Sequence, residues 1–249
     1  MSAWGRPLIF IPTYNEKDNV ERILTEILGL GLGTDVLFLD DNSPDGTGKI
    51  LDRMALGNPT VRVIHRPGKA GIGSAHQAGI ARAYDQGRRI LITMDCDFTH
   101  PTKYIPDFLA RAEAADVAVG TRFERADSLA DWDPVRLVLT HMAHHLTKVM
   151  LDMPYDATGA FRLYRLDRIP RALWGLVRSV GYSFFIESLF VLHRNRFPIT
   201  EVPITLPART KGHSKMTVRD AFRTAARLWE LQLEVKRTPG RFRLEKERG

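Results

Sequence analysis

The sequence has a single cysteine, Cys96, and no long hydrophobic run. One cysteine excludes an intramolecular disulfide framework and fits a reducing compartment. The longest stretches without a charged residue, 70–81 and 137–147, are well short of the roughly 20 residues that a membrane-spanning helix needs. The apolar run at 7–12 is too brief for a signal peptide. We therefore expect a cytoplasmic protein that does not cross a bilayer.

The excess of positive charge is confined to the end of the chain. The sequence has 36 Lys and Arg against 29 Asp and Glu, a net charge of +7, and residues 209–249 hold 12 of the basic and 5 of the acidic residues. Residues 1–208 are therefore neutral. Basic charge over a whole domain is typical of nucleic-acid binding, whereas a basic tail on a neutral body favours a local phosphate or a membrane surface. We expect no nucleic-acid partner.

Short apolar runs alternate with amphipathic segments through the first half of the chain. The runs predict buried strands, and the segments between them have helical spacing. The expected strands are 8–11, 36–39, 61–64, 90–94 and 117–119, and the expected helices are 16–28, 47–54, 74–86 and 101–114. This rhythm predicts an α/β fold with a mostly parallel sheet and a site at the carboxyl ends of its strands.

The second half predicts fewer strands and a helical tail. We expect a helix at 136–150, a strand at 160–164, two helices within 172–194 and an edge strand at 199–206. The segment 217–237 predicts an amphipathic helix, with Arg219, Arg223 and Arg227 in a stripe at a spacing of four. We divide the chain into a domain of residues 1–216 and a basic tail of residues 217–249. The tail either packs on the domain or lies on a membrane.

Acidic residues stand directly after two of the expected strands. Asp40 and Asp41 follow the second strand, and Asp95 and Asp97 follow the fourth. Residues i and i+2 of an extended chain point to the same side, so Asp95 and Asp97 can bind one hard divalent cation. A solvated turn is the alternative interpretation of a lone Asp-X-Asp. The second acidic pair favours the cation, because the carboxylates would otherwise repel one another.

A glycine-containing segment does not match the dinucleotide-binding fingerprint. Gly71-Ile-Gly73-Ser-Ala-His76 has a histidine where that fingerprint requires its third glycine. Gly71 and Gly73 are therefore expected to allow a tight turn into the next helix.

Six short motifs occur in order along the chain. They are Ile11-Pro-Thr-Tyr-Asn-Glu16, Leu39-Asp-Asp-Asn-Ser-Pro-Asp-Gly-Thr47, Met94-Asp-Cys-Asp-Phe-Thr-His-Pro101, Gly120-Thr-Arg122, Thr158-Gly-Ala-Phe-Arg-Leu-Tyr164 and Arg209-Thr-Lys-Gly-His-Ser-Lys215. Together they resemble the dolichol-phosphate mannose synthases, inverting family-two glycosyltransferases of the GT-A (Rossmann-like) fold. The resemblance extends over roughly residues 7–216, and six ordered motifs are far more specific than one.

The resemblance implies a nucleotide-sugar site, with GDP-mannose as the expected donor. Glu16 and Asp41 are expected to accept hydrogen bonds from the base or ribose, and Pro12 and Tyr14 offer flat apolar contact. Leu39 is the fifth nucleoside contact that the resemblance implies.

The same resemblance implies a metal site on the diphosphate. Asp95 and Asp97 would hold Mg²⁺ or Mn²⁺, and Cys96 would contribute backbone contacts. The cation would stabilise negative charge on the departing nucleotide.

Basic residues of the motifs are expected to contact phosphate. Arg122, Arg209 and Lys215 would neutralise the leaving diphosphate or hold the acceptor phosphate. Arg136 stands where the family has an arginine at a helix start and is a further candidate for the acceptor phosphate, with a surface-helix residue as the alternative interpretation. Together with Asp97, these four residues form the expected catalytic set.

The implied acceptor is a polyprenyl (dolichyl or undecaprenyl) monophosphate. The second pKa of a phosphate monoester is ~6, so its oxygen is already a largely ionised nucleophile and needs no general base. A hydroxyl acceptor would need one, with Asp97 or a nearby carboxylate the first candidate. A lipid acceptor predicts a protein that binds peripherally to the cytoplasmic face of a membrane, with its tail attracted to anionic lipid.

One segment departs from the family pattern. Where relatives often have Ser-Arg/Lys-Gly-Ala-Asn, this chain has Thr140-His-Met-Ala-His144. The departure keeps an alternative open, namely a soluble glycosyltransferase that uses a UDP-sugar and a hydroxyl acceptor. His141, His144 and His145 have the spacing of zinc ligands, but a polar helix face is the favoured interpretation.

Overall fold

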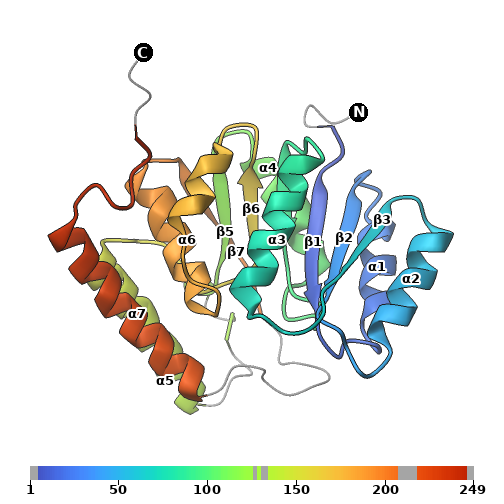
Figure 1. Ribbon diagram of the computed structural model, residues 1–249, viewed down its shortest axis with the longest axis horizontal. Coiled ribbons are helices and arrows are strands. Elements are labelled where there is room, and N and C mark those ends of the chain that lie inside the picture. Colours follow the sequence, from blue (N-terminus) through green and yellow to red (C-terminus); the bar gives the residue numbers. More distant parts are fainter. Residues whose placement is uncertain (1–4, 126–127, 130–133, 207–217, 246–249) are drawn as a thin grey trace.

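A seven-stranded sheet runs through the middle of the molecule (Figure 1). The computed structural model describes residues 5–125, 128–129, 134–206 and 218–245. The strands are β1 (Leu8–Thr13), β2 (Asp35–Asp40), β3 (Val61–His65), β4 (Ile90–Thr93), β5 (Val117–Thr121), β6 (Arg162–Arg165) and β7 (Ile199–Pro203). Their order is β3-β2-β1-β4-β6-β5-β7, with β6 antiparallel to both neighbours and all other pairs parallel. The predicted α/β fold is confirmed.

Helices connect the strands close to where the sequence predicts them. They are α1 (Val20–Gly29), α2 (Thr47–Gly57), α3 (Ile72–Asp85), η1 (Thr102–Tyr104), α4 (Ile105–Arg111), α5 (Pro134–Leu151), η2 (Arg171–Leu176), α6 (Ser183–Arg194) and α7 (Val218–Arg237). Two differ from the prediction. The first begins at Val20 rather than residue 16, because Asn15 has a left-handed backbone (φ 57°) and Glu16 begins a turn. The segment 101–114 divides into a 3₁₀ turn and the shorter helix α4.

Two layers of helices cover the sheet, because successive side chains of each strand point to opposite faces. Phe10 of β1 packs with α3 and α6, whereas its neighbours Ile9 and Ile11 pack with α1. In Figure 1, α3 and α6 lie in front of the sheet and α1 and α4 lie behind it. All three β1 side chains are fully buried. A core on each face holds the strand ends in fixed positions.

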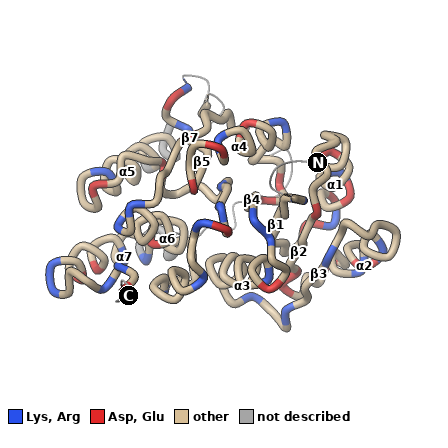
Figure 2. Tube along the Cα trace, turned by 90° about the horizontal axis from the view of Figure 1, so that it is seen from above, with Lys and Arg blue, Asp and Glu red and all other residues tan. Residues whose placement is uncertain are grey.

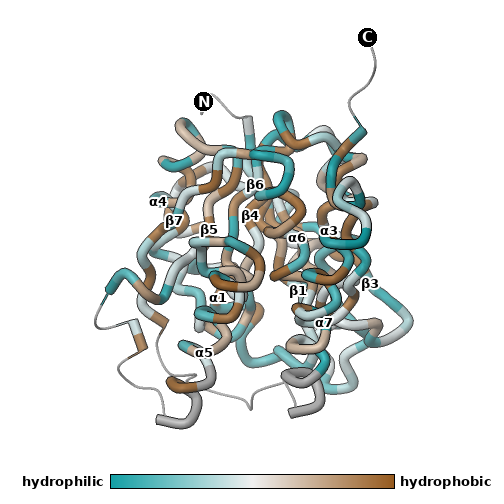
Figure 3. Tube along the Cα trace, turned by 90° about the vertical axis from the view of Figure 1, so that its left-hand side faces the viewer, coloured by the Kyte–Doolittle hydropathy of each residue, from teal (hydrophilic) through white to brown (hydrophobic). Residues whose placement is uncertain are grey.

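The helix α7 is part of the front layer. Leu228 and Leu231 of this helix, and Phe242 beyond it, are buried in the same core as Phe10. Trp229, which the sequence places on the same face as Leu228, is 63% exposed. Arg227, the last residue of the predicted arginine stripe, has a side chain that is only 16% exposed and forms ion pairs with Glu187 of α6 and with two glutamates of α7 itself. Figure 3 looks onto α5 and α7 and shows hydrophobic and hydrophilic residues alternating along them.

The predicted division between residues 216 and 217 lies outside the described residues. Seen from above, basic and acidic segments are interspersed along the helices around the sheet (Figure 2), as expected for a neutral body. In the described ranges, no helix has both the length and the apolar character that crossing a bilayer requires.

Candidate active site

The carboxyl ends of β1, β2 and β4 meet at one edge of the sheet. Pro12 pairs with Leu39, Thr13 pairs with Asp40, and the N–H of Asp41 donates to the carbonyl of Thr13 (3.1 Å). On the other side of β1, Phe10 pairs with Thr93, which places the residues that follow β4 at the same level. Because β5 is also parallel to β1, Arg122 follows at this edge too. The structure thus places Asp41, the turn with Asp95 and Asp97, and Arg122 at the same edge of the sheet.

The predicted metal ligands lie in a turn after β4. Asp95 and Asp97 are half-buried while Cys96 between them is 2% exposed, so both aspartates are more accessible than the residue that separates them. The turn is held from within: the N–H of Asp95 donates to Nδ1 of His100 (2.9 Å), and Oγ1 of Thr99 donates to Oδ1 of Asp97 (2.6 Å). The shared side that the spacing predicts for the two carboxylates stays a prediction.

These two carboxylates fit a hard divalent cation. Carboxylate oxygens are the ligands that Mg²⁺ and Mn²⁺ prefer. In the part of the chain that the structure describes, no group of three or more His, Cys, Asp or Glu side chains could hold a metal ion. The arrangement that the resemblance implies is a pair of protein carboxylates, with further ligands supplied by a diphosphate. The assignment of Asp95 and Asp97 as ligands stays a prediction.

The two aspartates after β2 face different partners. Asp41 accepts a bidentate pair of hydrogen bonds from Arg66, with Nε–Oδ1 2.5 Å and Nη2–Oδ2 2.7 Å. Asp40 instead accepts hydrogen bonds from the N–H (3.1 Å) and hydroxyl (2.5 Å) of Ser43. Arg66 directly follows β3, so the end of this third strand adds a positively charged side chain to the same edge. A carboxylate whose geometry is fixed in this way can orient a base or ribose.

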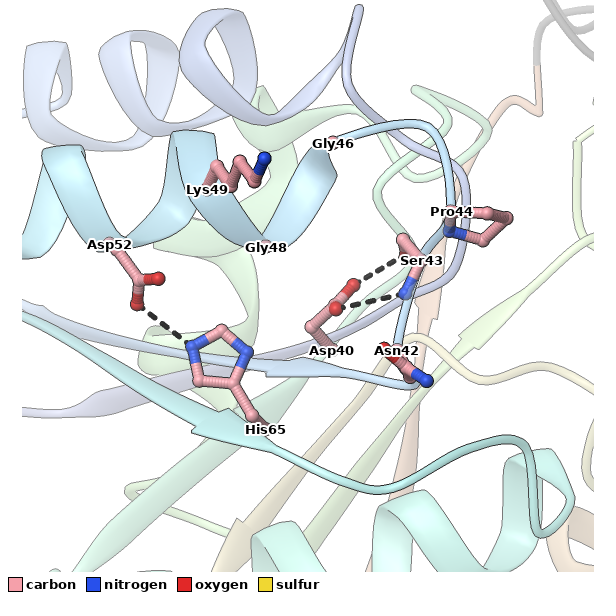
Figure 4. Close-up of a pocket in the computed structure, with 9 residues that line it drawn as sticks. All are labelled: Asp40, Asn42, Ser43, Pro44, Gly46, Gly48, Lys49, Asp52 and His65. Carbon is pink, nitrogen blue, oxygen red and sulfur yellow. Dashed lines mark hydrogen bonds and ion pairs between the residues drawn. The ribbon is translucent and has the colours of Figure 1, made fainter.

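A pocket of about 290 Å³ lies beside Asp40, beyond the ends of β2 and β3 (Figure 4). Figure 4 shows the Asp40 carboxylate turned toward Ser43, and His65 of β3 in contact with Asp52 of α2 (2.8 Å). The lining of this pocket also includes Lys49. The predicted site residues, Asp41 included, lie outside this lining, so the pocket is adjacent to the candidate site rather than part of it.

The remaining predicted nucleoside contacts surround the end of β1. Glu16 is buried, accepts a hydrogen bond from Asn19 (2.6 Å) and is held by its own N–H, which donates to Thr47 (2.9 Å). The ring of Tyr14 is half-buried, with the ammonium of Lys69 3.9 Å from its centroid. Pro12 is half-buried at the edge, but Leu39 is fully buried in the core. The side chain of Leu39 therefore packs in the core beneath the site and does not line it.

Arg122 is held by a buried acid. Its guanidinium donates to Asp156 through Nε (2.7 Å) and Nη2 (2.6 Å) and also contacts the hydroxyl of Thr158. Burial favours the neutral form of the Asp156 carboxyl, but the charge and hydrogen bonds of Arg122 outweigh it and lower the pKa of Asp156. The N–H of Asp156 in turn donates to the carboxylate of Glu201 on β7 (2.8 Å). The predicted phosphate ligand thus has a fixed orientation.

The altered family segment lies next to Arg122. Phe123 stacks on His144 of α5 with 3.9 Å between ring centroids, and His141 lies 5.3 Å away. Burial lowers the pKa of His144, so its imidazole is neutral at neutral pH. The three predicted histidines form no metal-binding group among the described residues. Phe123 and His144 together form an aromatic wall beside Arg122.

Three of the predicted phosphate contacts are not described. Arg209 and Lys215 lie outside the described residues, and so does the side chain of Arg136, although its backbone belongs to the first turn of α5. Their roles stay predictions.

The comparison with known families decides the class of the protein. The model of the family named Glycosyl transferase family 2 matches residues 8–169, which include β1 to β6 and the acidic turn after β4. The chain belongs to glycosyl transferase family 2. The resemblance found in the six motifs is thereby confirmed, and the protein is a glycosyltransferase.

Two curated relatives match most of the chain. The polyprenol monophosphomannose synthase of Mycolicibacterium smegmatis is 34% identical over 241 residues, which are 94% of this chain and 91% of that protein. The undecaprenyl-phosphate mannosyltransferase of Micrococcus luteus is 34% identical over 213 residues, 85% of this chain and 88% of its own length.

Solved structures of glycosyltransferases share the fold. Glucosyl-3-phosphoglycerate synthase from Mycobacterium tuberculosis, in complex with Mn²⁺ and UDP-glucose, superposes with a TM-score of 0.59 at 19% identity, covering 92% of this chain and 79% of that one. The mannosyltransferase PcManGT from Pyrobaculum calidifontis, in complex with GDP-Man and Mn²⁺, gives 0.51 at 17% identity, covering 84% and 59%. These similarities confirm the predicted GT-A fold.

Sequence reasoning missed two residues of the site. Arg66 was not selected, although a basic residue directly after the third parallel strand is the signal that could have found it. Asp156 precedes β6, whose antiparallel direction brings its amino end to the edge where the other strands end. A sequence that predicts only parallel strands gives no reason to expect an acid there.

Proposed function

We propose that this protein transfers mannose from GDP-mannose to a polyprenyl monophosphate at a membrane surface, with Mg²⁺ or Mn²⁺ as cofactor. The observation that supports it most is the single sheet edge where Asp95 and Asp97, Asp41 with Arg66, and Arg122 with Asp156 meet. Both curated relatives, matched over most of their length, carry names of polyprenyl-phosphate mannosyltransferases.

Asp95 and Asp97 would hold the divalent cation, which neutralises charge on the diphosphate when bound. The residues around them set the geometry: His100 holds the backbone of Asp95, and Thr99 holds the carboxylate of Asp97. The nucleoside would lie along the ends of β1 and β2, against Tyr14 and the Asp41–Arg66 pair. Fixed ligands of this kind place the anomeric carbon without reorganisation during transfer.

Arg122 is suited to a phosphate of the donor or the acceptor. Among the described residues, its contacts with Asp156 use Nε and Nη2, and Nη1 is the nitrogen left to meet a phosphate oxygen. Arg136, Arg209 and Lys215 would add further positive charge. An ionised acceptor phosphate attacks without a general base, so the work of the site is alignment and charge stabilisation. Asp97 is then a metal ligand and not a base.

Exposed apolar residues support contact with a membrane. Of the eight exposed large hydrophobic side chains in the described ranges, five are on α5 and α7: Val138, Met142, Val149, Trp229 and Leu233. The two helices pack against each other, and the exposed cations Lys148, Lys236 and Arg237 accompany them. Apolar side chains with basic neighbours bind anionic lipid surfaces.

The test incubates the purified protein with Mg²⁺ or Mn²⁺, radiolabelled GDP-mannose and undecaprenyl or dolichyl phosphate. We expect a labelled lipid product that depends on both the cation and the lipid phosphate. Parallel reactions supply UDP-glucose or UDP-GlcNAc with sugar hydroxyl acceptors. Product only in those reactions would contradict the proposal in favour of a soluble UDP-sugar enzyme.

A further inference from the structure

A fully buried carboxylate lies away from the turn after β4 that contains Asp95 and Asp97. Glu187 of α6 is 0% exposed. Its oxygens accept hydrogen bonds from the N–H of Arg178 (3.1 Å), from the N–H of Ser179 (2.8 Å) and from the hydroxyl of Ser179. Arg227 of α7 supplies the opposite charge, with Nη2 3.0 Å from Oε1. A buried charge with this many donors ties the segment before α6 to the tail helix.

The tied segment rests on the first turn of α3. The N–H of Ser74 donates to the carbonyl of Val180 (3.1 Å). The approach is close enough that a Cβ atom at Gly73 would lie 2.8 Å from the carbonyl of Gly181. Gly71 has φ +94°, a conformation that L side chains rarely adopt, which confirms the glycine turn that the sequence predicts.

The first turn of α3 also binds Arg66, which lies at the carboxyl ends of the strands. Arg66 donates through Nη1 to the hydroxyl of Ser74 (2.7 Å), while its Nε and Nη2 bind Asp41. The contacts therefore form a series. Arg227 binds Glu187, Glu187 binds Ser179, and the next residue, Val180, accepts the hydrogen bond from Ser74. Ser74 in turn binds Arg66, which binds Asp41.

The loop at 178–180 packs on α3 on one side and is open on another. A pocket of about 620 Å³ borders it, lined by residues 70–71, by 178–183 and by Arg223, Arg227 and Glu234 of α7. The exposed fraction of Val180, 53%, shows the same open side. A loop with a hollow on one side depends on its hydrogen bonds for its position.

We propose that Glu187 and Arg227 are positioning residues for the donor site: they hold the loop at 178–180 against α3 and thereby keep Arg66 on Asp41. The inference rests on the proposed function, because it takes Asp41 as a nucleoside ligand. It makes α7 a determinant of donor affinity that acts through Glu187 and the loop at 178–180.

The first test measures binding of GDP, with UDP as a second probe, by titration calorimetry on the full-length protein. Arg227→Met is expected to raise the Kd for GDP about 3- to 10-fold, the range typical of residues that act through a packed network. The KM for GDP-mannose should rise by the same factor while kcat stays within about twofold. Arg227→Lys should recover part of the affinity, because it keeps the charge without the planar fork.

The matched control is Arg171→Met. It breaks an exposed ion pair with Asp85 (2.7 Å) at the opposite end of α3 and should leave the Kd for GDP unchanged. Circular dichroism and thermal unfolding establish that each variant is folded at the assay temperature. A folded Arg227→Met protein with wild-type affinity for GDP would overturn the inference.

A double-mutant cycle with Ser74→Ala tests the route. If the series of contacts carries the effect, Arg227→Met adds little to the loss that Ser74→Ala already causes, so the two factors do not multiply. Independent, multiplying factors would overturn the proposed route. A second cycle replaces Arg227→Met by Glu187→Gln. It tests the same route if the Arg227→Met protein does not fold. Wild-type protein that binds neither GDP nor UDP would instead contradict the proposed function.

Discussion

Arg122 and Asp156 form a bidentate ion pair that joins the end of β5 to the segment before β6, with Nε–Oδ2 2.7 Å and Nη2–Oδ1 2.6 Å. Asp156 is 1% exposed and the side chain of Arg122 is 11% exposed. The pair orients one fork of the guanidinium inward, so that the rest of the group has a single direction in which to meet a phosphate. Loss of the pair should lower both the free energy of unfolding and the rate of transfer.

Asp156→Asn should lower mannosyl transfer and destabilise the fold. Removing one partner of a buried pair leaves the other charge uncompensated and costs about 3–5 kcal/mol. The free energy of unfolding, measured by urea titration at pH 7, should fall by that order. Because the pKa of Asp156 is lowered in the folded protein, the difference from wild type should shrink as pH falls below the ordinary carboxyl range. An Asn variant as stable as wild type at pH 7 would show that the pair contributes nothing net.

Asp97→Asn should abolish metal-dependent transfer without unfolding the protein. The amide is a weaker ligand for a hard cation, and we expect turnover to fall by about 100-fold or more. The hydrogen bond from Thr99 can still form to the amide oxygen, so circular dichroism should not change. Asp107→Asn, an exposed change on α4, is the control. Undiminished Mn²⁺-dependent turnover would remove Asp97 from the metal site.

His76 should make the protein sensitive to mild acid. It is fully buried among Phe10, Phe184 and Phe185, and within the described part of the chain both ring nitrogens lack a hydrogen-bond partner. Burial, reinforced by the charge of Arg162, lowers the pKa of His76 to about 3 from 6.5. The unfolded chain therefore takes up a proton between those values and the folded protein does not, so stability is lost as pH falls from 6.5 toward 3.

The expected loss at pH 4.5 is roughly 2–3 kcal/mol relative to pH 7, at 1.36 kcal/mol for each pKa unit. His76→Leu should remove that part of the pH dependence in urea titrations at the two pH values. His145→Leu makes the same change at an exposed position of α5 and should leave the pH dependence as it is. Equal pH dependence in wild type and His76→Leu would contradict the assignment.

Trp229→Ser should weaken binding to vesicles of anionic phospholipid. The indole is 63% exposed, and losing its transfer into the lipid interface lowers partitioning by about tenfold. Binding should also weaken as salt rises, since Lys236 and Arg237 are attracted electrostatically. Leu56→Ser on α2, a residue 90% exposed at the other end of the sheet, is the control. If both variants bind vesicles equally, α7 is only a packing element.

The fold was largely predictable because its signals are local. Short aliphatic runs predict β1 to β5, and the acidic residues after two of these runs lie at or just after the ends of β2 and β4. Pairings between distant residues were not predictable. Arg66 and Asp41 are 25 residues apart and Arg122 and Asp156 are 34 apart.

The tail shows the same limit. The spacing predicted a helix, but which of its side chains are buried depends on partners outside it. Arg227 turns toward the domain because Glu187, on another helix, is buried opposite it. A charge pattern on one helix cannot show a carboxylate on the next.

The antiparallel strand β6 also determines the order in which the site can be assembled. The half that contains the acidic turn is built from β1 to β4, which are complete by residue 97 and pair through neighbouring crossovers. Among the described strands, the half of the sheet that contains Arg122 is joined to it by β6, which pairs with β4 on one side and β5 on the other. On the ribosome, a nascent chain shorter than about 165 residues therefore has a donor half with an open β4 edge. Once β6 has been made, this four-residue strand can close the open edge of β4, but β7 and the expected phosphate contacts Arg209 and Lys215 still lie further along the chain.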